Sequence, residues 1–300
     1  MHILVLSNLE DPHAQHIANA LSMSGVIVNY LCTRSFPTDI QISWQPDEQV
    51  GFLTLPDRQR LNLQDIHKVF WRNFCVPHIP DLKDGDLQAI AYSDTMSVLR
   101  TLLQADPDMW VNSWQAYQFH KEKPLQLSKV KQLGVPIPAT LISNDPEKIS
   151  EFSRLHKAIF KPVYGGTHTQ LVTESHLDPE RLNSVLKLSP VTIQAYIPGT
   201  NIRSYVIGDN VYSAEIRSNA LDFREDDASQ LIPVEIPEYV RQQCLAITQA
   251  LMLKWTAIDW RLQPTGEYIF LEANPSPMFI YFENQTGFPI TQKLVQLLMS

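Results

Sequence analysis

The pattern of the chain changes near residue 158, and this change limits the folds that are open to it. Before that point, apolar runs typical of buried strands alternate with helical patterns. One such β-α-β unit comprises His2–Ser7, a helix that begins at Asp11-Pro12, and Val26–Leu31. Beyond residue 158, short strand patterns follow one another with turn signals such as Gly208-Asp-Asn210. The sequence therefore predicts an α/β protein whose C-terminal half has α+β character.

The same criteria predict the remaining elements. Strands are expected at Val69–Phe74, Ala158–Val163, Gln170–Thr173, Val191–Tyr196, Ile202–Ile207, Val211–Ile216, Thr256–Leu262 and Tyr268–Asn274. Helices are expected at about Leu87–Leu103, Pro124–Leu133, Asp145–Leu155, Tyr239–Leu253 and Pro289–Met299. The first strand-to-helix turn contains no glycine, which argues against a dinucleotide-binding fingerprint.

Composition excludes several classes of function. The chain carries 24 Lys and Arg against 32 Asp and Glu, a net charge of −8, so we expect no nucleic-acid partner. No apolar run approaches the roughly 20 residues of a membrane span, and no basic targeting segment precedes the first strand, so we expect no membrane partner. Three widely spaced cysteines without a metal motif are typical of reduced thiols. These features predict a cytoplasmic protein.

Two strands near the C-terminus carry residues that suit a metal site. Asp259 lies on the first strand of this hairpin, and Glu272 and Asn274 lie on the second. Alternation places Glu272 and Asn274 on the same face, so three oxygen ligands can converge on a Mg²⁺ ion that also holds phosphate oxygens. The alternative interpretation is a hairpin with solvated polar ends.

A lysine within an apolar run suggests an anion site. Lys161 lies in Ala158–Val163, and Gly165 and Gly166 follow shortly after. A buried lysine requires an anion, and paired glycines allow backbone N–H groups to approach phosphates. The alternative is an edge-strand lysine before an ordinary turn.

The order of these features is more informative than any one of them. The ordered set is Lys123, Gly134–Thr140, Phe160-Lys161-Pro162, Gly165-Gly166, Gln194–Gly199, Asn201-Ile202-Arg203, Ala257-Ile258-Asp259 and Leu271–Pro277. This order resembles the ATP-grasp superfamily, and in particular RimK-type amino-acid ligases and microviridin-type peptide-cyclising ligases. The resemblance implies an ATP-grasp fold with an N-terminal pre-ATP-grasp α/β domain at 1–110. It also implies a central subdomain at 111–190 and a C-terminal subdomain with the metal site at 191–300.

The resemblance also assigns roles to matching positions. Lys123 and Lys161 match the lysines that hold the ATP phosphates, and Asn201 stands at the ribose position. The adenine-reading hinge corresponds to Gln194, Ala195, Tyr196 and Ile197. The arginines that meet the acceptor and the phosphoryl group correspond to Arg203, Arg217 and Arg224. Ala195 and Asn201 stand where the family usually has acidic residues.

The implied activity is ATP-dependent ligation of a carboxylate to an amine or hydroxyl through an acyl phosphate, with release of ADP and phosphate. The implied cofactors are ATP and Mg²⁺ or Mn²⁺, and the implied partner is a carboxylate-bearing peptide or amino acid. Two alternatives stay open: a non-catalytic paralogue that binds nucleotide or peptide, and a kinase on the same fold. The sequence also leaves a homodimer open. Trp71-Arg72 resembles a Trp-x-Arg-like stretch of the peptide-cyclising ligases, the alternative being a buried Trp beside a surface Arg.

Overall fold

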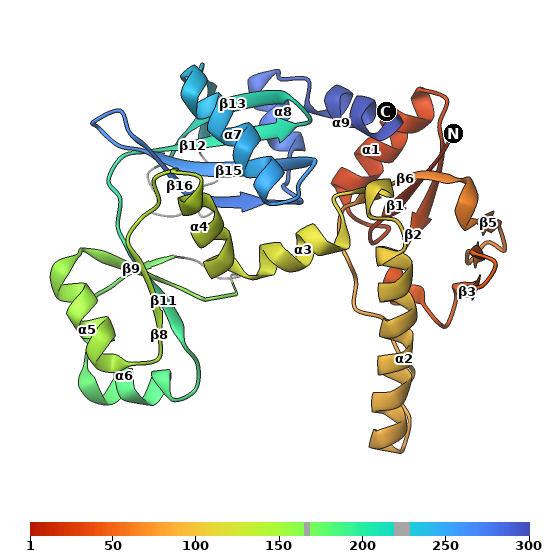
Figure 1. Ribbon diagram of the computed structural model, residues 1–300, viewed down its shortest axis with the longest axis horizontal. Coiled ribbons are helices and arrows are strands. Elements are labelled where there is room, and N and C mark those ends of the chain that lie inside the picture. The colour runs from red at the N-terminus through yellow and green to blue at the C-terminus, as the bar shows by residue number, and fades with distance from the viewer. Residues whose placement is uncertain (165–168, 219–228) are drawn as a thin grey trace.

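The computed structural model describes residues 1–164, 169–218 and 229–300. Figure 1 shows an N-terminal part on the right, a C-terminal sheet at the upper left and a smaller central sheet at the lower left. The helix α3 (Trp114–Lys121) connects the N-terminal part to the other two. Among the described helices, none has the length and apolar content needed to cross a membrane.

The N-terminal part contains the predicted β-α-β unit. Its parallel sheet has the order β2-β1-β6-β7, formed by β1 (His2–Leu6), β2 (Ile27–Leu31), β6 (Ile66–Trp71) and β7 (Trp110–Val111). The helix α1 (Pro12–Met23) begins as predicted, with the Asp11 side chain accepting from the Ala14 N–H. The strand expected at Val69–Phe74 instead spans Ile66–Trp71. The start of the strand was missed because His67 and Lys68 are polar. Its end was placed too late because the backbone leaves the sheet at Arg72.

Two features of this part were not predicted correctly. A separate antiparallel sheet of β3 (Gln41–Gln45), β4 (Val50–Thr54) and β5 (Arg60–Asn62) was not anticipated. The helix α2 (Gly85–Gln104) forms as expected, but its N-terminal half projects from the molecule (Figure 1), so Leu87 and Ile90 are exposed. Leu99 and Leu103 of the other half reach the core.

The central part is an antiparallel sheet covered by two helices. Its strand order is β10-β9-β11-β8, formed by β8 (Thr140–Ser143), β9 (Ala158–Lys161), β10 (Gln170–Leu171) and β11 (Val191–Ala195). The covering helices are α5 (Pro146–Leu155) and α6 (Pro179–Leu186), of which the second was not predicted. Ile149, Leu182 and Ile193 form its small core. The helix α4 (Lys123–Gln132) leads into this part.

The C-terminal part is a five-stranded sheet with the order β14-β13-β12-β15-β16. The strands are β12 (Thr200–Ile207), β13 (Asn210–Arg217), β14 (Gln230–Pro233), β15 (Trp255–Leu262) and β16 (Tyr268–Asn274). The helices of this part are α7 (Glu238–Ala250), α8 (Ile280–Thr286) and α9 (Ile290–Met299). Elsewhere in the chain, short 3₁₀ turns lie at Thr33–Ser35, Leu63–Asp65, Pro107–Met109 and Glu174–His176.

The two ends of the chain share one core. One face of the five-stranded sheet packs on α7, while the other faces α8, α9 and the N-terminal part. Buried Ile17 of α1, Trp255 of β15 and Leu294 of α9 belong to the same apolar cluster, and α1 and α9 lie side by side in Figure 1. The division at residues 110 and 190 stays a prediction.

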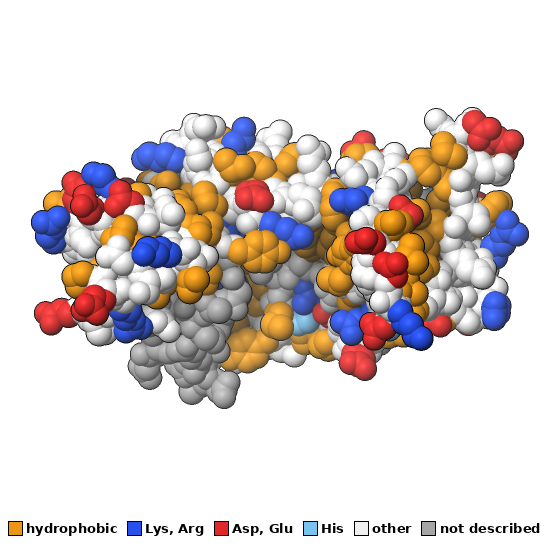
Figure 2. All heavy atoms as spheres, turned by 90° about the horizontal axis from the view of Figure 1, so that it is seen from below, with side chains coloured by type: hydrophobic (Ala, Val, Ile, Leu, Met, Phe, Trp, Pro, Cys, Tyr) orange, Lys and Arg blue, Asp and Glu red, His pale blue; other side chains and the backbone are white. Residues whose placement is uncertain are grey.

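Charged side chains of both signs are interspersed on the face drawn in Figure 2. Lys and Arg lie among Asp and Glu at both ends of the molecule, and apolar side chains gather near the middle. The atoms described on this face therefore form no extended basic surface.

Candidate functional site

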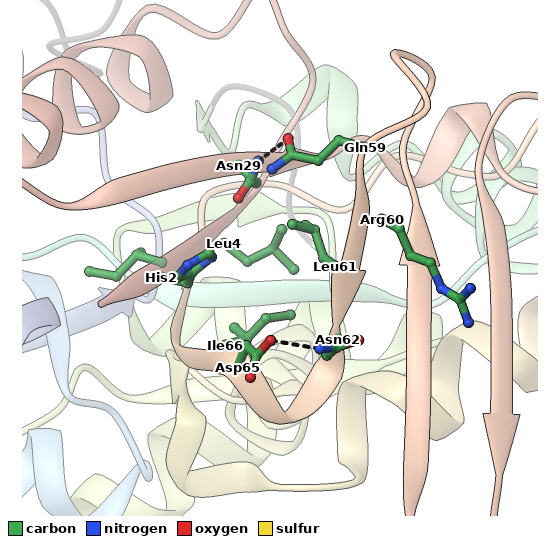
Figure 3. A pocket seen from close by; sticks show the side chains of 10 residues that line it. His2, Leu4, Asn29, Gln59, Arg60, Leu61, Asn62, Asp65 and Ile66 are labelled. Carbon is green, nitrogen blue, oxygen red and sulfur yellow. Dashed lines mark hydrogen bonds between the residues drawn. The ribbon is translucent and has the colours of Figure 1, made fainter.

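The described part of the chain includes a small cavity and a large one. The smaller, of about 90 Å³, lies between β1, β2 and the β5 segment, where Asn29 pairs with Gln59 and Asn62 with Asp65 (Figure 3). It is far smaller than the roughly 300 Å³ of the smallest typical ligand sites. The larger, of about 700 Å³, lies between the central sheet, α4 and the C-terminal sheet. It is lined by every described residue predicted to bind nucleotide or metal, and by Arg203.

The two predicted phosphate lysines reach this cavity from different elements. Lys161, at the end of β9, donates from Nζ to Gln194 Oε1 at 3.0 Å, and the buried Gln194 amide in turn donates to Thr140 Oγ1. Lys123, in the first turn of α4, lies 3.1 Å from Glu272 Oε2. Both ammonium groups are therefore positioned by fixed partners.

Gln126 attaches α4 to the strand that carries Glu272. It is buried, and its side-chain amide exchanges two 3.0 Å hydrogen bonds with the backbone of Ala273. Because Gln126 lies three residues after Lys123, these bonds fix the turn that presents Lys123 to Glu272. Sequence reasoning missed Gln126, since a glutamine within a short helix gives no signal of burial.

The predicted hinge, Gln194–Ile197, borders the cavity with its backbone already partly paired. The N–H groups of Ala195 and Tyr196 donate to Ala139 O and Lys157 O, both at 2.8 Å. The N–H of Ile197 makes no hydrogen bond with the residues the structure describes, so it is the hinge donor best suited to a base. Gly199 is required beyond the hinge, because a Cβ there would lie 2.0 Å from the carbonyl oxygen of Leu262.

Arg261 connects the hinge to the predicted ribose position and was missed in the sequence. Its Nε donates to Ile197 O at 2.9 Å, and its Nη1 donates to Asn201 Oδ1 at 2.5 Å. Arg261 lies two residues beyond Asp259, so strand alternation could have placed both on the cavity face.

The carboxylates meet across the predicted hairpin. Asp259 and Glu272 are directly opposite in the β15–β16 ladder, and Asn274 follows on the same strand. Asp259 is buried and accepts two hydrogen bonds from Arg203, at 2.7 and 2.8 Å. Asn274 Oδ1 accepts from the Ser276 N–H at 2.9 Å. The three predicted ligands therefore line one cavity, and each of them is oriented by a neighbour.

Positive charges keep the Glu272 carboxylate ionised. Partial desolvation in the cavity would by itself raise the pKa of Glu272, but Lys123, and then Lys161 and Arg203, lower it to about 2. Burial disfavours the Arg203 cation, yet Asp259 outweighs this effect and raises the pKa of Arg203. The Glu272 carboxylate and the Arg203 guanidinium therefore stay charged at neutral pH.

The donor set fits Mg²⁺ shared with phosphates. Mg²⁺ prefers oxygen ligands, and it is usually held by one or two carboxylates together with substrate phosphates. The described residues contain no group of three His, Cys, Asp or Glu that would form an all-protein metal cage. Asp259, Glu272 and Asn274 would hold the ion, beside lysines that would hold the phosphates.

The remaining predicted residues lie elsewhere. Arg217, at the end of β13, is outside the cavity lining and pairs with Glu215 Oε1 at 2.9 Å, with 61% of its side chain exposed. Its catalytic role stays a prediction. Gly165, Gly166 and Arg224 lie outside the described residues.

We expect Lys161→Met to weaken Mg·ATP binding about 10- to 100-fold, because a charge-assisted hydrogen bond to phosphate contributes roughly 1.5–3 kcal/mol. Calorimetric titration with a non-hydrolysable analogue measures this loss. Lys187→Met, at an exposed position after α6 of the same part, is the matched control. Unchanged affinity in Lys161→Met would return Lys161 to a structural role.

We expect stability to fall as the pH drops from 6.5 to 4. Burial and Lys123 lower the pKa of His120 from 6.5 to about 4, so the unfolded chain binds a proton in this window before the folded chain does. The contribution of His120 is complete above pH 6.5 and is lost towards pH 4, on the order of 2 kcal/mol. Denaturant unfolding at pH 7 and 4.5 should show a smaller difference for His120→Gln than for the exposed control His78→Gln.

Comparisons with known proteins agree with this geometry. Residues 120–298 match the RimK-like ATP-grasp domain. Over the whole of both chains, the structure is similar to the macrocyclase MdnC bound with precursor peptide MdnA from Microcystis aeruginosa MRC, at 25% identity and a TM-score of 0.87.

It is also similar to the ATP-grasp ligase PsnB complexed with minimal precursor, Mg and ADP, at 27% identity and a TM-score of 0.84, over 99% of this chain and 96% of PsnB. A Chryseobacterium gregarium RiPP-associated ATP-grasp ligase shares the fold at 24% identity and a TM-score of 0.87, over 99% of this chain and 96% of that one. The search of curated proteins found no match.

The comparisons also bear on the expected fold and cofactors. The predicted ATP-grasp fold is confirmed. The expected cofactors, ATP and Mg²⁺, are confirmed at the level of the family. Because the match spans more than half of the sequence and includes every described residue of the cavity, the chain belongs to the RimK-like ATP-grasp family.

Proposed function

We propose that this protein is an ATP-dependent ligase that activates a carboxylate of a peptide as an acyl phosphate and joins it to an amine or hydroxyl. The observation that carries the proposal is the single cavity in which Lys123 and Lys161 face Asp259, Glu272 and Asn274. The peptide substrate is supported by the similarity to MdnC and PsnB, both solved with precursor peptides. The alternative substrate is a free amino acid.

The residues of the cavity divide into groups by their chemistry. The hinge, with Asn201 and Arg261, would hold the nucleoside, while Lys123 and Lys161 would hold the phosphates. Mg²⁺ held by the carboxylates would neutralise charge on the phosphate oxygens. Arg203 adds a fixed positive charge beside them, since Asp259 holds its guanidinium in a bidentate pair.

The proposed reaction has two balanced steps. In the first, a substrate carboxylate oxygen attacks the γ-phosphorus, the bond between that phosphorus and the β–γ bridging oxygen breaks, and ADP leaves. In the second, an amine or hydroxyl attacks the acyl carbon, the carbon–oxygen bond to phosphate breaks, inorganic phosphate leaves, and the nucleophile releases its proton to solvent. Catalysis of this kind depends on positioning and electrostatics.

The two rival functions make different products. A non-catalytic binding paralogue is favoured by Ala195 and Asn201, and it would release no ADP. A kinase would leave phosphate on a hydroxyl. That the protein forms a homodimer stays a prediction of the sequence.

Product analysis tests the proposal. Given Mg·ATP and a precursor-type peptide with acidic side chains and Lys, Ser or Thr, we expect one ADP and one free phosphate for each bond formed. The peptide should lose the mass of one water per bond. AMP with pyrophosphate, or a stable phosphopeptide, would contradict the proposed ligase.

A further inference from the structure

The segment that follows β16 is held by the N-terminal part of the chain. Its contacts are Asn112 Nδ2 to Pro275 O at 2.8 Å, Arg72 Nη1 to Ser276 O at 2.6 Å, and Phe279 N–H to His13 Nδ1 at 3.3 Å. This segment directly follows the predicted metal ligand Asn274, the last residue of β16, and it includes Met278, which lines the cavity. The N-terminal part therefore supports one wall of the site from behind.

Of these residues, Arg72 makes the most hydrogen bonds to the segment. It is 7% exposed, and its Nε lies 3.2 Å from Asp11 Oδ1. Its Nη1 donates to both the carbonyl oxygen and the Oγ of Ser276, each at 2.6 Å, and the Ser276 hydroxyl donates back to Arg72 O at 2.5 Å. Arg72 is therefore not the surface arginine that the alternative interpretation of Trp71-Arg72 expected. It is a buried cation with a matched carboxylate, directed at one serine.

Ser276 passes this constraint to the metal site. Its backbone N–H donates to Asn274 Oδ1 at 2.9 Å, while Thr256 Oγ1 donates to the Asn274 carbonyl oxygen at 2.7 Å. An amide side chain that accepts an N–H at its oxygen has a fixed orientation, because rotating the amide by 180° would place NH₂ against that N–H. A second lone pair of the same oxygen is left for a cation.

We propose that Arg72 is a positioning residue for the metal site: through Ser276 it holds the side-chain oxygen of Asn274 towards the ion. This inference rests on the proposed function, because it requires that Asp259, Glu272 and Asn274 bind Mg²⁺. Partners that orient metal ligands typically contribute 10- to 100-fold to metal affinity. The N-terminal part would thus contribute to metal affinity in the nucleotide site without touching the nucleotide.

The test is Mn²⁺ binding, followed by electron paramagnetic resonance in the presence of a non-hydrolysable ATP analogue. We expect Arg72→Met and Ser276→Ala each to raise the Mn²⁺ dissociation constant about tenfold or more, with nucleotide affinity in the absence of metal unchanged. His13→Leu is the matched control, since it removes a contact to the same segment beyond Ser276, and it should leave Mn²⁺ affinity at the wild-type value. If Arg72→Met does not fold, Ser276→Ala and Arg72→Lys decide the question.

A double-mutant cycle distinguishes an effect on the orientation of Asn274 from a general loss of rigidity around the site. In an Asn274→Ala background, Arg72→Met should cause no further loss of Mn²⁺ affinity, because its effect passes through the missing side chain. Two results would refute the role of Arg72 while leaving the metal site intact. One is wild-type Mn²⁺ affinity in a Ser276→Ala protein that still melts cooperatively. The other is a loss of Mn²⁺ affinity in His13→Leu equal to that in Arg72→Met. Failure of the wild-type protein to bind Mn²⁺ with the analogue would overturn the metal site, and the role of Arg72 with it.

Discussion

Glu272→Ala should lower the rate of ADP formation at least about 100-fold at limiting Mg²⁺, while the protein still melts cooperatively. Two losses coincide in this variant. The proposed metal site loses one of its two carboxylates, and Lys123 loses the partner 3.1 Å away that orients it. Removing a single electrostatic group from a preorganised site typically costs 10²- to 10³-fold in rate. The fold should survive because 42% of the Glu272 side chain is exposed, so no core contact is removed.

A conservative variant and a matched control sharpen this result. Glutamine keeps an oxygen ligand without the charge, so Glu272→Gln should regain part of its activity as Mg²⁺ is raised, whereas Glu272→Ala should not. Glu267→Ala removes an exposed carboxylate from the same hairpin, outside the cavity, and should match wild type. ADP formation at the wild-type rate by Glu272→Ala at limiting Mg²⁺ would mean that the metal binds elsewhere.

Local pattern was sufficient to predict the hairpin that carries the proposed metal ligands. Alternation along a strand has a period of two, so Glu272 and Asn274 share a face wherever that strand lies. The turn at Gly208, whose φ is +54°, was likewise predicted from adjacent residues alone. Both inferences rest on chemistry confined to a few consecutive positions.

Features that depend on distant partners were not predictable. Asp259 and Arg203 are 56 residues apart in sequence, and their bidentate pair exists only because β12 and β15 are neighbours in the sheet. The buried Arg72 donates hydrogen bonds to Ser276, which lies 204 residues away in the sequence. The β3–β5 sheet was missed for a different reason: its strands are short, and β3 and β5 are largely exposed, so they lack a strong apolar alternation.

Hydroxylamine should convert the substrate carboxylate into a hydroxamate, and only when Mg·ATP is present. An acyl phosphate carries an activated carbonyl, and hydroxylamine is small enough to reach it where the natural amine or hydroxyl would attack. Trapping therefore reports the first step independently of the second, even when the correct nucleophile is missing from the peptide. Mass spectrometry of the peptide identifies the carboxylate that was activated.

The choice of substrate decides whether this experiment is informative. Binding contacts remote from the reacting carboxylate contribute to orienting it, so free Glu or Asp should give much less hydroxamate than an acidic precursor-type peptide. Glu272→Ala supplies the background rate, because it should bind the same peptide without activating it. A hydroxamate formed equally in that variant would place the chemistry outside the cavity. Phosphate left on a Ser or Thr hydroxyl, with no hydroxamate, would instead show that the cavity directs the γ-phosphoryl group to an alcohol, as in a kinase.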